Sequence, residues 1–240
     1  MSLRFISMIL GGLVLSNLAF SAPTEPVQTP AVTVYGEIAA RFTTTSCALP
    51  CQQPRSSDWY FWRANDRVEI RADSSEVGEI WRRDAKGQVS FVYVEPLHRR
   101  GIEYSAVDLR MIHHRRSWDE LASIVPPAEL AQLAPVGETE ILGHKAQRYR
   151  GKLGARTLEV VWVPDLQLAT QVINTGSDRQ VTTELKSLLT DQDPIASISD
   201  DTLNDFQLVD FADVGDMETN ESMAWLKQAL AAPGHEHHDH

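Results

Sequence analysis

The clearest fold signal in the chain is the hairpin pattern of residues 79–94, which reads Glu79-Ile80-Trp81-Arg82, then Asp84-Ala85-Lys86-Gly87, then Val89-Ser90-Phe91-Val92-Tyr93-Val94. Two runs rich in aromatic and β-branched residues flank a turn that ends in glycine, which is typical of paired antiparallel strands. A second pattern of this kind precedes it, with Trp59-Tyr60-Phe61-Trp62 and Arg67-Val68-Glu69-Ile70-Arg71 on either side of residues 64–66. Both patterns predict antiparallel sheet.

Working outward, further strand patterns fill most of the chain between residues 32 and 188. Apolar residues alternate at Val32, Val34, Ile38, Ala40 and Phe42, the period of a strand with one buried face. More strands are expected at residues 100–104, 138–142, 145–150, 157–163, 168–174 and 180–188. The connections are short, whereas parallel strands need long crossovers. We therefore predict a mainly β (α+β) fold with eight to ten antiparallel strands.

A helical insertion interrupts the strands in the middle of the chain. Ser117-Trp118-Asp119-Glu120 matches a capping box and predicts a short helix that ends near Val125. Pro127 suits a first helical position, so a second helical piece is expected over residues 127–133.

The first 21 residues are predicted to be a signal peptide. Arg4 precedes an apolar run over residues 5–15, and Ala19-Phe20-Ser21 offers a cleavage site before Ala22. The alternative, a membrane anchor, needs about 20 apolar residues, and this run is shorter. A Pro/Thr-rich lead over residues 22–31 is expected to be flexible. We therefore expect a secreted, periplasmic protein without a transmembrane segment after signal removal.

Two cysteines, Cys47 and Cys51, are the only ones in the chain. In an oxidising compartment a nearby pair usually forms a disulfide. The alternative is a copper-binding thiolate pair, which is known on thioredoxin-like folds, and the sequence has no βαβ pattern. A structural disulfide is the favoured interpretation.

The net charge of −11 belongs to the last fifty residues. Residues 191–240 hold twelve acidic side chains and one basic one, Lys227, whereas residues 1–190 are balanced. We divide the region after the β domain (residues 32–190) into an acidic linker (191–219), a helix (220–231) and a His-rich tail (232–240). A secreted, acidic chain argues against nucleic acid as a partner.

The tail ends in four closely spaced histidines, His235, His237, His238 and His240. Imidazole is a good ligand for Zn²⁺, Cu²⁺ and Ni²⁺, so these residues are candidate metal ligands, although no cofactor is certain. The alternative is a solvated tail without a function.

Two further stretches carry a resemblance to a known family. They are Leu133-Ala134-Pro135-Val136-Gly137-Glu138-Thr139-Glu140-Ile141-Leu142-Gly143-His144 and Glu159-Val160-Val161-Trp162-Val163-Pro164-Asp165-Leu166-Gln167-Leu168-Ala169. The order of parts over residues 32–188 resembles the LolA/LolB-like superfamily of periplasmic lipoprotein carriers. One departure is Ala169, which stands where that family usually has proline.

The resemblance implies a half-barrel, a curved antiparallel sheet closed on its concave side by short helices. It also implies a hydrophobic, lipid-like ligand or a lipidated protein partner. The aromatic residues that would line such a face are Trp59, Phe61, Trp81, Phe91, Tyr93 and Trp162. The alternative is that they are ordinary core residues.

The sequence contains no Gly-x-Ser-x-Gly elbow, phosphate-binding glycine loop or HExxH pair. A non-enzymatic protein is therefore expected. Three hypotheses remain: a carrier of a hydrophobic ligand or lipidated partner, a metal-binding accessory protein that uses its tail, and an interaction module that docks through its acidic tail.

Overall fold

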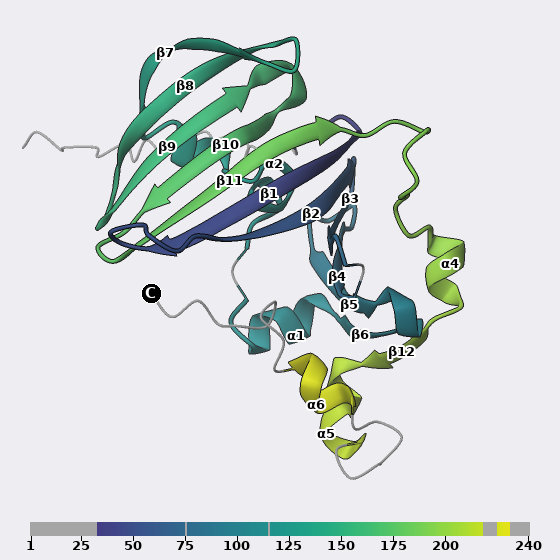
Figure 1. The fold of residues 1–240 in the computed structure, drawn as a ribbon. Coiled ribbons are helices and arrows are strands. Elements are labelled where there is room, and N and C mark those ends of the chain that lie inside the picture. Colours follow the sequence, from purple (N-terminus) through teal and green to yellow (C-terminus); the bar gives the residue numbers. More distant parts are fainter. Residues whose placement is uncertain (1–32, 75, 115, 218–224, 231–240) are drawn as a thin grey trace, which may run out of the picture. The chain divides into compact units, whose positions relative to one another are not determined.

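The protein is built around a single sheet of twelve strands (Figure 1). The structure is a computed structural model, and it describes residues 33–74, 76–114, 116–217 and 225–230. All of these lie within one compact unit, residues 32–240. The predicted signal peptide and lead (residues 1–31) and the His-rich tail (232–240) lie outside the described residues. The strands are β1 (Ile38–Ala48), β2 (Arg55–Ala64), β3 (Arg67–Ala72), β4 (Gly78–Arg83), β5 (Val89–Glu95), β6 (Arg100–Tyr104), β7 (Ala134–Ile141), β8 (His144–Leu153), β9 (Arg156–Val163), β10 (Leu168–Thr175), β11 (Arg179–Leu188) and β12 (Gln207–Asp210).

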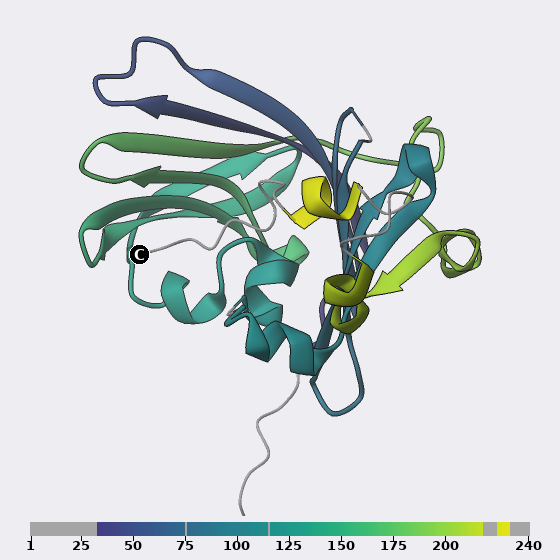
Figure 2. The same cartoon turned by 90° about the horizontal axis from the view of Figure 1, so that it is seen from below.

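The strand order is β12-β6-β5-β4-β3-β2-β1-β11-β10-β9-β8-β7. Consecutive strands pair as antiparallel neighbours within β1–β6 and within β7–β11, and the pairing of β1 with β11 joins these two halves. In that register Phe42 faces Leu185 and Thr44 faces Thr183. The sheet is curved, and the short helices from the middle of the chain lie on its concave side (Figure 2). The predicted mainly β fold with a curved antiparallel sheet is confirmed.

The helices are short, and several begin at a capping side chain. They are α1 (Ala106–Met111), α2 (Trp118–Ser123), α3 (Pro127–Leu130), α4 (Asp200–Asn204), α5 (Val214–Met217) and α6 (Trp225–Leu230), with 3-10 turns η1 (Pro96–His98), η2 (Pro164–Leu166) and η3 (Phe211–Asp213). The predicted pair of helical pieces corresponds to α2 and α3. The prediction missed α1, whose capping box is formed by Ser105 and Asp108.

The main core lies on the concave face. Side chains alternate along each strand, so residues such as Phe61 on β2 and Trp81 on β4 point to the same side. There they pack with Leu121 of α2 and with Leu226 of α6. Rings continue this core in a stacked series, with centroid distances of 4.3 Å for Trp81–Phe91, 5.2 Å for Phe91–Tyr104 and 4.6 Å for Tyr104–Phe211.

The first strand differs from its prediction at its start, whereas the cysteine pair agrees with its prediction. The strand begins at Ile38 instead of Val32, and Val34 before it is exposed. Cys47 at the end of β1 forms the expected disulfide with Cys51.

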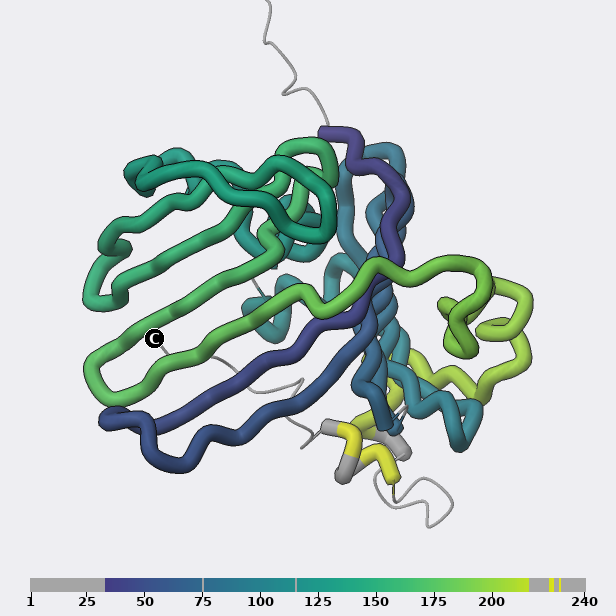
Figure 3. The backbone as a smooth tube through the Cα atoms, turned by 45° about the horizontal axis from the view of Figure 1, so that its top comes forward, coloured from purple at the N-terminus to yellow at the C-terminus, as the bar shows by residue number. Residues whose placement is uncertain are grey.

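The predicted acidic linker, residues 191–219, requires a correction over its described part, because residues 196–217 pack on the sheet. Residues 196–206 cover the convex face of β4 and β5, where Ile198 and Leu203 pack on Ile80, Val92 and Val94. β12 then adds to the sheet edge in parallel with β6, so that Val209 faces Ile102. Figure 3 shows this segment, light green to yellow, beside the blue strands of the N-terminal half. The acidic composition of this segment favoured the prediction of a linker, although a few apolar residues pack the segment on the sheet.

The predicted helix at 220–231 agrees with α6 over residues 225–230. Residues 218–224 and 231 lie outside the described residues. Trp225, Leu226 and Ala229 of α6 are buried in the main core. The guanidinium of Arg100 lies 4.5 Å from the centre of the Trp225 ring. The C-terminal segment thus contacts both faces of the sheet.

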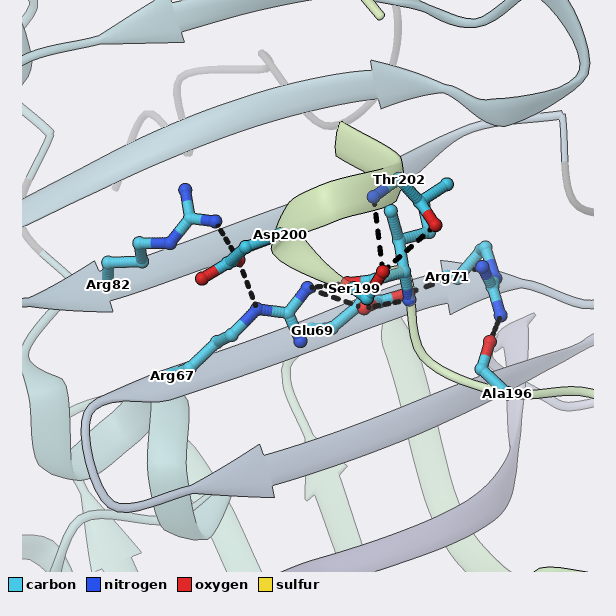
Figure 4. A network of polar contacts seen from close by, with 9 residues as sticks. Arg67, Glu69, Arg71, Arg82, Ala196, Ser199, Asp200 and Thr202 are labelled. Atoms are coloured by element: carbon cyan, nitrogen blue, oxygen red, sulfur yellow. Dashed lines mark hydrogen bonds and ion pairs between the residues drawn. The ribbon is translucent and has the colours of Figure 1, made fainter. Parts of the chain in front are cut away.

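A buried carboxylate anchors this segment on the convex face (Figure 4). Glu69 of β3 is fully buried, and its Oε2 accepts hydrogen bonds from Arg67 Nη2 and from the Ile198 backbone N–H, both at 2.9 Å. Arg71 Nη1 lies 3.3 Å from Glu69 Oε1, and Arg71 also donates to the Ala196 carbonyl. Burial raises the pKa of the Glu69 carboxyl, against the opposing effect of the two arginines.

Candidate groove on the concave face

Two adjoining hollows lie between the concave face of the sheet and the helices α2 and α3. The first, of about 260 Å³, is lined by Trp59, Phe61, Ile70, Glu79, Arg116, Glu120, Leu121, Ile124 and Thr183. The second, of about 510 Å³, is lined by Glu120, Ile124, Val125, Pro126, Glu129, Arg156, Leu158, Val172, Asn174, Val181 and Thr183. Because Glu120, Ile124 and Thr183 line both hollows, we treat the two as one groove.

Strand alternation supplies the floor of the groove. Val172 on β10 and Val181 and Thr183 on β11 point to the concave face. Their direct neighbours Ile173 and Thr182 point to the convex face, because side chains alternate along a strand. Thr183 Oγ1 lies 3.1 Å from Thr44 Oγ1, and the Trp59 indole donates to that same Thr44 oxygen at 2.9 Å. The floor therefore combines aliphatic and aromatic side chains with a few hydroxyl groups.

The roof of the groove is held in place by Arg63, a buried residue of β2. Its guanidinium donates to the carbonyls of Ala122 in α2 at 2.7 Å and Leu166 in η2 at 2.7 Å, and its Nε donates to Gly36 at 2.8 Å. Burial lowers the pKa of Arg63 to about 10, so the guanidinium stays protonated at neutral pH. Near it, the Tyr35 hydroxyl donates to Asp119 of α2 at 2.8 Å. These contacts fix α2 above the sheet.

The rim of the groove carries charged pairs. Arg116 Nη1 lies 3.2 Å from Glu79 Oε2, and the Trp81 indole donates to the same carboxylate oxygen at 2.9 Å. Arg156 Nη2 lies 3.2 Å from both carboxylate oxygens of Glu129. A groove with a mixed floor of apolar side chains and hydroxyl groups and a charged rim suits an amphipathic molecule better than a wholly apolar one.

The aromatic residues proposed as ligand contacts occupy different positions in the structure: some line the groove and others lie in the core. Trp59 and Phe61 line the first hollow, and their contact with a ligand stays a prediction. Trp81, Phe91 and Tyr93 are buried in the main core and do not line either hollow, and burial raises the pKa of the Tyr93 hydroxyl to about 12.

Trp162 packs, half-buried, against the smaller apolar cluster of Leu158 and Val160. Contact between Trp162 and a ligand stays a prediction.

The charged rim was not predicted from the sequence. Glu120 was interpreted as a helix-capping residue, and no sequence motif marks Arg116, Glu129 or Arg156 as neighbours of one groove. Only the folding of α2 and α3 over the sheet brings these side chains together.

The proposed metal ligands His235, His237, His238 and His240 lie outside the described residues. Within the described ranges, no group of three or more His, Cys, Asp or Glu side chains is arranged to hold a metal ion. No described helix has the length and hydropathy of a transmembrane span.

No protein-family model and no curated protein sequence matches the chain. Solved structures similar to it include PNGF-II, at 14% identity over 75% of this chain and 33% of that chain, with a TM-score of 0.43. The MucA/MucB complex of Pseudomonas aeruginosa matches at 15% identity over 71% of this chain and 58% of that chain, with a TM-score of 0.34. A LolA superfamily protein from Nitrosomonas europaea matches at 10% identity over 66% of this chain and 87% of that chain, with a TM-score of 0.31.

Members of the superfamily that the sequence resembles are thus among the similar structures. The chain spans only about a third of the PNGF-II chain. With TM-scores of 0.43 and below, these similarities carry no conclusion about ligand, activity or partner.

Proposed function

We propose that this protein is a non-enzymatic, periplasmic carrier that binds an amphipathic, lipid-like ligand in the groove beneath α2 and α3. The observation that supports the proposal is the groove itself, in which Ile124, Val172 and Val181 offer apolar surface below a charged rim. Its second hollow, about 510 Å³, falls within the range of about 300–1,000 Å³ that is usual for small-molecule sites. The localisation rests on the predicted signal peptide.

Native mass spectrometry and lipid extraction of protein purified from the periplasm test this proposal. We expect the intact protein to carry a co-purifying amphiphile that organic extraction releases. Protein that is empty under native conditions, and that binds no added long-chain amphiphile, would contradict the proposal.

A matched pair of substitutions on one strand locates the ligand. Thr183→Trp places a large side chain in both hollows, whereas Thr182→Trp places the same side chain on the convex face of β11. We expect Thr183→Trp to lose the bound amphiphile and Thr182→Trp to keep it. Equal retention by both variants would place the ligand elsewhere on the protein.

A further inference from the structure

The charged side chains on the walls of the groove do not balance. Glu79, Glu120 and Glu129 stand against Arg116 and Arg156. Glu129 and Arg156 form one close pair, and Glu79 and Arg116 form another, each at 3.2 Å. Among the described residues, Glu120 has only the 3.7 Å approach of its Oε1 to Arg116 Nε, and Arg116 is already paired with Glu79. The described walls of the groove therefore carry one negative charge in excess, and that charge belongs to Glu120.

Glu120 occupies the junction of the two hollows. It lines both, and its side chain is 40% exposed. Of the two hydrogen bonds of a capping box, the described residues form one, from the Glu120 backbone N–H to Ser117 Oγ at 3.1 Å. The Glu120 carboxylate is thus part of the wall of the groove, although its sequence position predicted a helix-capping role.

The surroundings of Glu120 match a positively charged group attached to an apolar chain. On one side, the partly exposed ring of Trp59 lines the first hollow in front of the buried Phe61, and aromatic rings attract cations. On the other side, the partly exposed side chains of Ile124, Val172 and Val181 line the second hollow and offer apolar contact.

We infer that the groove selects amphiphiles that carry an ammonium group, and that Glu120 receives this group while the apolar chain lies in the second hollow. This inference rests on the proposed function, since it names the ligand class of the same groove. The ammonium group occurs both in long-chain amines and in the headgroups of zwitterionic phospholipids.

Calorimetry of the full chain with four ligands of equal chain length tests the inference. Dodecylamine and a twelve-carbon lysophosphatidylethanolamine carry the ammonium group, dodecanoate carries a negative charge, and 1-dodecanol is neutral. We expect at least one ammonium ligand to bind about fivefold or more tightly than 1-dodecanol, and dodecanoate to bind more weakly than 1-dodecanol, because a partly exposed ion pair contributes up to about 1 kcal/mol. Which ammonium ligand binds more tightly identifies the source.

Three substitutions make the result specific. Glu120→Gln should remove the preference for the ammonium ligands and leave the affinity for 1-dodecanol unchanged. Arg116→Gln should strengthen ammonium binding, because it frees the Glu79 carboxylate. Glu138→Gln, on the exposed strand β7, makes the same change in net charge outside the groove and should have no effect.

Two outcomes overturn the inference, and they differ from failure of the proposed function. If all four ligands bind equally, or if Glu120→Gln weakens all four alike, Glu120 does not select the headgroup, although the carrier function stands. If none of the four binds, the proposed function fails as well.

Discussion

The Glu69 anchor on the convex face gives a prediction whose size follows from the structure. Glu69→Leu removes a fully buried carboxylate and leaves Arg71, with 7% of its side chain exposed, without its counter-charge. It also removes the acceptor of the Ile198 N–H group. Loss of one partner from a buried ion pair costs about 3–5 kcal/mol. We take the lower end, about 3 kcal/mol, because the Arg67 side chain is 18% exposed and remains partly hydrated.

Urea denaturation followed by tryptophan fluorescence measures this loss. With a slope of about 2–3 kcal/mol per molar urea, a loss of about 3 kcal/mol lowers the midpoint by about 1–1.5 M. Hydrogen exchange should show faster exchange at residues 196–206, because Glu69 and its arginines hold that segment on the sheet.

A double variant separates charge from packing. Glu69→Leu combined with Arg71→Met removes both members of the buried pair, and such replacements are often neutral or stabilising. We expect the double variant to recover more than half of the loss. A single variant that unfolds within about 1 kcal/mol of the parent would refute the reasoning, because the carboxylate would then contribute little to holding the C-terminal segment.

Three further predictions concern other parts of the chain. Arg63→Met should lower the free energy of unfolding by at least about 3 kcal/mol, measured by urea denaturation, because it leaves buried carbonyl groups without donors; a change below about 1 kcal/mol would contradict its role as the anchor of α2. The hydrogen bond from Thr43, together with Arg41, lowers the pKa of the Asp58 carboxyl in the folded protein. The ionised Asp58 therefore stabilises the fold at pH values above its unfolded pKa of about 3.9, and this stabilisation is lost as the pH falls through the lower folded pKa. A carboxyl carbon NMR titration of Asp58 with its midpoint above about 3.9 would contradict this. Calorimetry should show tighter binding of Zn²⁺ or Cu²⁺ by the full chain than by a chain that ends at Pro233, and equal affinities would remove the tail as a metal site.

Local patterns in the sequence determined most of the sheet. The hairpin turns at residues 65–66 and 84–87, the strand alternation and the Ser117 cap each depend on neighbouring residues, so they could be predicted without the fold. The disulfide between Cys47 and Cys51 was predictable for the same reason, since the two residues are four positions apart. Alternation also assigned Trp59 and Phe61 to one side of β2, but the sequence left open which side of the sheet that is.

Only the tertiary structure decided which distant segments meet. The pairing of β1 with β11, the parallel addition of β12 to β6 and the burial of Ile198 against Ile80 join residues more than a hundred positions apart. Local sequence propensity does not predict such contacts, because their stability comes from apolar surface that becomes buried only when the whole chain has folded. The same reason applies to Glu120, whose place in the first turn of α2 follows from sequence but whose position in the groove depends on the sheet beneath that helix.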